Sequence, residues 1–158
     1  MVISIPAFHV SDHSKLEGSG EVFVSSRKSG ANSGVFKVAV NPVITFDPPD
    51  YPIGGVVISA DLFDSATGTF ISTSIDLINS HGKYSPTVAL TGRCKGDISG
   101  TLTHGLRFWL MVVDNNSVGN AAGTPTPDIV SFAVHDLHGD LVAYGTGPVR
   151  AGNFKVSA

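Results

Sequence analysis

Apolar and polar residues alternate with a period of two along most of this chain, and this alternation constrains its fold more than any other feature. Residues 35–40, for example, place Phe36, Val38 and Val40 on one side and Lys37 on the other. Clusters of Gly, Pro, Asn and Asp interrupt the alternating segments at intervals of about 8–12 residues. No segment sustains the period of an amphipathic helix. The pattern therefore predicts an all-β protein built from antiparallel strands.

The strands are expected to form one domain over residues 1–158, because no linker or change in composition divides the chain. We count roughly nine to eleven strands, which favours an antiparallel β-sandwich or jelly roll, with a closed β-barrel as the second choice. Four glycines mark residues 92–105 as a loop or a weak edge strand. The sequence Gly-Thr-Gly-Pro at 145–148 is expected to end a strand.

Composition excludes several classes of protein. Charged residues make up 15% of the chain and the net charge is −3, whereas a nucleic-acid surface needs a concentrated positive footprint. A coiled coil or a disordered tail needs far more charge. No apolar run approaches the ~20 residues of a transmembrane helix, and the N-terminus shows no positively charged leader. We expect a soluble protein with no visible signal peptide and no cofactor.

The segment 106–113 breaks the alternation because both of its faces are apolar. An exposed edge strand with this composition would template aggregation, so the segment is predicted to be a central strand. Phe108 and Leu110 should then lie in the core. Trp109 and Met111, on the opposite face, should be covered by the long loop at 114–128 or by a neighbouring subunit.

These features favour a non-enzymatic β-sandwich that acts by binding or self-association, as a structural or ligand-binding module. Low charge leaves few charged side chains to cover a small protein, and contact between copies would bury apolar surface. We therefore expect the protein to form a homo-oligomer or to self-assemble. Trp109, Met111 and Tyr144 are the expected interface or binding residues. A small-molecule or carbohydrate ligand stacking on an aromatic side chain is the other form of binding, with Tyr51, Tyr84, Trp109 and Tyr144 as its candidates.

The alternative is a small cofactor-free enzyme with a histidine and an aspartate acting as acid and base in a pocket between sheets or within a barrel. The candidate pairs join His104 or His135 to Asp114 or Asp136. No nucleophile motif supports this alternative, since the chain contains no Gly-x-Ser-x-Gly sequence.

The segment His-Asp-Leu-His-Gly-Asp at 135–140 offers weak metal candidates in His135, His138 and Asp140. Asp and Gly are also the residues that a hairpin turn requires, and a turn is the preferred interpretation. Cys94 is the single cysteine and excludes an internal disulfide. Its flanking Arg93 and Lys95 are able to activate a thiol, but we expect an inert cysteine near a strand end.

Overall fold

The computed structural model describes residues 15–24, 34–45, 53–62, 67–81, 86–98, 100–115 and 126–157. These residues form eight strands: β1 (Lys15–Val24), β2 (Gly34–Thr45), β3 (Ile53–Leu62), β4 (Gly68–His81), β5 (Thr87–Ile98), β6 (Thr101–Val113), β7 (Ile129–His135) and β8 (Leu141–Ser157). Each strand pairs antiparallel with the next, and β8 pairs with β1. The result is a closed barrel in which spatial order follows chain order.

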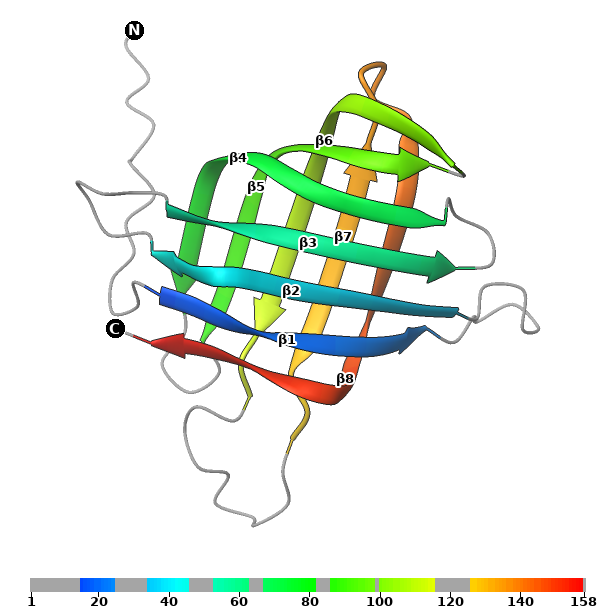
Figure 1. Cartoon of the computed structure of the whole chain (residues 1–158). Coiled ribbons are helices and arrows are strands. Elements are labelled where there is room, and N and C mark those ends of the chain that lie inside the picture. The colour runs from blue at the N-terminus through cyan, green and yellow to red at the C-terminus, as the bar shows by residue number, and fades with distance from the viewer. Residues whose placement is uncertain are drawn as a thin grey trace, which may run out of the picture.

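The barrel wall has two layers, with β1, β2 and β3 on one side and β5, β6 and β7 on the other (Figure 1). Four strands, β4, β5, β6 and β8, bend so that parts of each lie in both layers. The first residues of β4, Gly68–Ile71, pair with β3, and β4 pairs with β5 from Phe70 onward. Strand β8 pairs with β7 up to Pro148 and with β1 from Val149. Within the described ranges, no helix is long and apolar enough to span a bilayer.

The predicted all-β class is confirmed, and the architecture is the closed barrel that ranked second. The preference for a sandwich or jelly roll was wrong because every strand pairs with its sequence neighbours and the last returns to the first. The described residues form eight strands, fewer than the nine to eleven expected. Residues 92–98 belong to β5, and residues 145–148 continue β8 through its bend. Glycines that were interpreted as interruptions therefore lie inside long, curved strands.

Inward-facing glycines make room for phenylalanine rings inside the barrel. Phe36 and Phe132 pack with their ring centroids 4.7 Å apart. A Cβ atom added at Gly145 would lie 2.9 Å from the Phe36 ring and 3.2 Å from the Phe132 ring. At Gly20, a Cβ atom would lie 2.6 Å from the ring of Phe154. The interior is thus filled by large and small residues in alternation, as in other small barrels.

Two buried aspartates complete hydrogen bonding where β8 leaves β7. Beyond Pro148 the edge of β8 that faced β7 pairs with no strand among the described residues. The N–H groups of Phe154 and Val156 donate instead to Asp128 Oδ2 and Asp114 Oδ2, each at 2.9 Å. Both aspartates are almost fully buried. Because buried N–H groups are costly to leave unpaired, these carboxylates substitute for a missing strand edge.

The prediction that residues 106–113 form a central strand with Phe108 and Leu110 in the core is confirmed. This segment belongs to β6, which is paired on both sides, with β5 and β7. Phe108 and Leu110 face the barrel interior and are 1% and 2% exposed.

Replacing Phe108 by alanine should lower the free energy of unfolding by about 3–5 kcal/mol, because the closed wall limits collapse around the vacated space. Urea unfolding followed by circular dichroism measures the loss. Leu102→Ala, on the same strand but with a side chain 62% exposed, is the matched control and should change stability by less than about 0.5 kcal/mol. Similar losses in both variants would contradict the assignment of Phe108 to the core.

Candidate functional site

The outer side of the layer from β4 to β8 carries two rows of side chains without a formal charge. Register pairing aligns one row across five strands: Leu77, Thr91, Trp109, Ala133 and Tyr144. The adjacent row runs in parallel: Asn79, Ala89, Met111, Ser131 and Thr146. We call these two rows the uncharged face. Several of its large apolar side chains are exposed, including Leu77 and Trp109, each at 51%.

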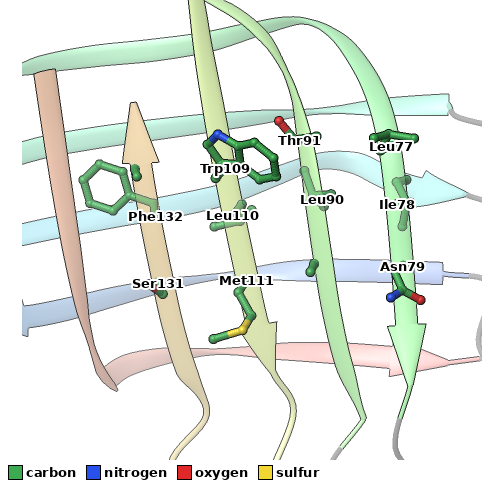
Figure 2. A pocket seen from close by; sticks show the side chains of 12 residues that line it. Leu77, Ile78, Asn79, Leu90, Thr91, Trp109, Leu110, Met111, Ser131 and Phe132 are labelled. Carbon is green, nitrogen blue, oxygen red and sulfur yellow. The ribbon is translucent and has the colours of Figure 1, made fainter. Parts of the chain in front are cut away.

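Trp109 and Met111 form a ridge along β6 between smaller neighbours (Figure 2). Ala89 lies beside this ridge on β5 and Ala133 on β7. The small residues leave an apolar groove of about 380 Å³. Its lining includes the ridge on β6 together with Leu77 and Asn79 on β4. Thr91, a member of the first row, is buried, and its hydroxyl donates to the Phe108 carbonyl oxygen at 2.7 Å. This hydroxyl is therefore already paired within the chain.

Most of the 114–128 loop, which is predicted to cover Trp109 and Met111, lies outside the described residues, so cover by the loop stays a prediction. Both side chains are open to solvent in the single chain, at 51% and 39%. The described ends of the loop pack elsewhere: Asn115 Nδ2 donates to the Pro127 carbonyl oxygen, and the Asp128 carboxylate accepts the N–H of Phe154. Cover by a neighbouring subunit remains a prediction.

The outer side of the opposite layer is charged. Glu21 on β1 accepts a hydrogen bond of 2.7 Å from Arg150 Nε and lies 3.5 Å from Lys37 Nζ. The hydrogen bond from Arg150 is the main reason that the pKa of Glu21 lies below its ordinary value. Further charged residues occupy outward positions on β1, β3 and β8: Lys15, Glu17, Asp61 and Lys155. The two outer faces of the barrel thus differ sharply in charge.

A second, more polar hollow of about 420 Å³ borders the uncharged face at Trp109. Its polar lining comes from Arg93 on β5, Arg107 on β6, and His135 and Asp136 at the end of β7. Arg93 lies directly opposite Arg107, and Arg107 directly opposite His135. Arg107 also forms an ion pair with Asp76 at 3.1 Å. The Nδ1 atom of His135 is buried and has no hydrogen-bond partner in the part of the chain that the structure describes.

The structure separates most of the acid–base candidates. Asp114 follows the end of β6 that is remote from His135, roughly 20 Å away along the strand. It binds the N–H of Val156 there. His104 is exposed near the start of β6 and does not line the polar hollow. Only His135 and Asp136 share that hollow, and among the described residues no hydrogen bond joins the His135 ring to a carboxylate.

The 135–140 segment forms the turn that its sequence indicated. Asp136 Oδ1 accepts the N–H groups of His138 and Asp140 at 2.8 and 2.9 Å, and Gly139 has a φ of 82°. That φ lies in the left-handed region, which glycine adopts at little cost. His135, His138 and Asp140 do not come together as a three-residue cluster that could hold an ion. In the part of the chain that the structure describes, no three His, Cys, Asp or Glu side chains are close enough to hold an ion.

The aromatic candidates lie only partly within the described residues. Trp109 and Tyr144 share a row of the uncharged face and are separated by Ala133 on β7. Two strand spacings, about 10 Å, therefore lie between their backbones. Tyr51 and Tyr84 fall outside the described residues.

Sequence reasoning did not identify Arg93 and Arg107 as a pair. They are fourteen positions apart, and only the register of β5 and β6 makes them neighbours. Their one signal in the sequence is that Arg107 is the sole charge in an otherwise apolar segment at 106–113.

No protein family model, curated protein or solved structure matches this chain.

Replacing Asp114 by alanine should lower the free energy of unfolding by about 1–3 kcal/mol, because the buried N–H of Val156 loses its acceptor. Urea unfolding measures the change. Asp97→Ala is the control, since Asp97 binds the Gly100 N–H at an exposed turn. A stability equal to that of the wild type would show that Asp114 is not a structural residue.

Burial raises the pKa of the Cys94 thiol to about 12. At pH 8 about one thiol in 10⁴ is then ionised, against roughly one in four for an ordinary cysteine. The native protein should therefore react with a disulfide reagent at least ~100-fold more slowly than the protein in urea. Absorbance of the released thiol gives both rates, and equal rates would contradict an inert Cys94.

Proposed function

We propose that this barrel is a non-enzymatic protein that acts by self-association through the uncharged face, with a second copy of the chain as the occupant. The observation that supports the proposal is the position of Trp109 and Met111, both exposed, at the centre of two uncharged rows. Exposed apolar patches of this kind mark interaction sites in soluble proteins.

The charge distribution favours a second copy over a charged partner. In a two-fold interface the same patch meets itself, so a patch with charges of one sign would repel its copy. The two rows carry no formal charge and meet without that penalty. Contact through the opposite outer face would instead require each charge to be paired with an opposite charge or removed from water, which is costly. The charged residues of that face include Lys15, Glu17, Glu21 and Lys155.

The relief of the face favours the same arrangement. The Trp109 and Met111 ridge stands one strand from Ala89 and one strand from Ala133. The ridge of one copy can therefore lie in the shallow channel above Ala89 or Ala133 of the other copy. A two-fold contact between identical patches needs shape complementarity of this kind. The polar groups of the second row do not oppose burial strongly, since the Ser131 and Thr146 hydroxyls are hydrogen-bonded to each other at 2.7 Å.

The size of the face indicates a modest affinity. Five strands at ~4.8 Å spacing and two outward rows at ~6.8 Å give about 24 Å by 14 Å, or ~330 Å² of flat sheet in each copy. Two copies together contribute ~650 Å², which is below the size of a standard interface and in the range of weak, transient contacts. A dimer that dissociates on dilution is therefore expected.

Light scattering coupled to size-exclusion chromatography over a range of loading concentrations tests the proposal. The wild type should shift from 16.4 kDa towards twice that mass as concentration rises. Trp109→Ala should weaken association ~30-fold or more, as expected for a buried tryptophan hot spot of about 2 kcal/mol, with little loss of stability. Leu102→Ala, exposed but outside the face, should associate as the wild type does.

A 16.4 kDa monomer at every concentration would exclude self-association. If Trp109→Ala instead lost stability and kept its oligomeric state, Trp109 would belong to the fold rather than to an interface.

A further inference from the structure

The row of basic side chains beside the uncharged face has an unusual arrangement. Arg93 and Arg107 are directly opposite across β5 and β6, so their Cβ atoms are about 5 Å apart. Like charges in such positions destabilise a sheet. The chain has only ten Lys and Arg residues in total, and two of them are placed against each other. A bound anion would turn this repulsion into attraction.

The acidic groups nearby are already engaged. Asp76 accepts hydrogen bonds from Ser74 Oγ at 3.0 Å and from Arg107 Nη1 at 3.1 Å. Asp136 binds two backbone N–H groups of its own turn. Arg93 forms no ion pair with any described residue, and its hydrogen bond to Ser74 Oγ comes from the backbone N–H rather than from the guanidinium group. Its guanidinium group is therefore available to a ligand.

The hollow in front of these residues has the size and composition of a small-molecule site. Its volume of about 420 Å³ falls within the range of ligand pockets. Trp109 and Leu137 supply apolar walls, and both side chains are exposed, at 51% and 77%. His135, with its unpartnered Nδ1, adds a polar ring to the same row. Basic groups on one side and an indole on the other are suited to a ligand with two unlike ends.

We propose that this hollow binds a small organic oxyanion, a carboxylate or phosphate ester with an aromatic or aliphatic group. The oxyanion would be held by Arg93 and Arg107, whose planar guanidinium groups match such anions. The apolar group would contact Trp109 and Leu137. This inference goes beyond self-association and does not depend on it, because the hollow lies within one chain.

Titration of the full chain with four probes tests the proposal: benzoate, phenyl phosphate, inorganic phosphate and benzamide. Trp109 is the single tryptophan, so its fluorescence reports directly on the hollow, and calorimetry gives an independent affinity. Benzoate or phenyl phosphate should bind, and the stronger of the two identifies the preferred anion. Benzamide, a neutral analogue of benzoate, should bind at least ~10-fold more weakly, because it cannot form charge-assisted hydrogen bonds.

Variants locate the site. Arg93→Gln should weaken binding of the preferred probe ~10-fold or more, and Arg93→Lys should restore part of it because the charge returns without the planar fork. Lys155→Gln removes one positive charge from the opposite outer face and should bind as the wild type does. Rising NaCl concentration should weaken binding of the anions.

Several outcomes would overturn the proposal: no binding of either organic anion up to about 10 mM, equal binding of benzamide and benzoate, or unchanged affinity in Arg93→Gln. Equal affinity for inorganic phosphate and phenyl phosphate would exclude the apolar half of the site. Light scattering on the same samples reports the oligomeric state separately, so failure of this site and failure of self-association are distinguishable.

Discussion

The change of partner along β8 is the constraint on which the rest of this structure depends. One strand pairs with β7 through Pro148 and with β1 from Val149, so it joins both layers and closes the wall. The bend leaves N–H groups without a neighbouring strand, and the buried carboxylates of Asp114 and Asp128 accept them. Without these acceptors, closure would leave unpaired donors in an apolar interior.

Closure also explains the combination of many glycines with many phenylalanines. A small barrel has a fixed interior width, so a large ring on one strand requires a small residue on the strand that faces it. Gly145 provides the space for Phe36 and Phe132, and Gly20 provides it for Phe154. This packing fills the space between the facing strands. The two hollows that could hold a partner are bordered by outward-facing side chains such as Trp109.

On the outer surface, charge is distributed unevenly between the two layers. The layer containing β1 and β2 carries the Glu21, Lys37 and Arg150 cluster. The layer containing β6 presents Trp109 and Met111 in rows that carry no charge. The first charged row beside them is that of Arg93 and Arg107. An apolar groove and a basic hollow therefore meet at one tryptophan. This juxtaposition is the basis for both proposals, one concerning a second copy and the other a small anion.

The sequence by itself determined the all-β class, the central position of residues 106–113 and the burial of Phe108 and Leu110, because alternation of period two specifies which residues share a face. It also indicated the turn around Asp136. Only the tertiary structure decided that the sheet closes, that Gly145 lies within a strand, and that Arg93 faces Arg107. Those features depend on register between distant segments, which is set by long-range pairing and interior volume rather than by local pattern.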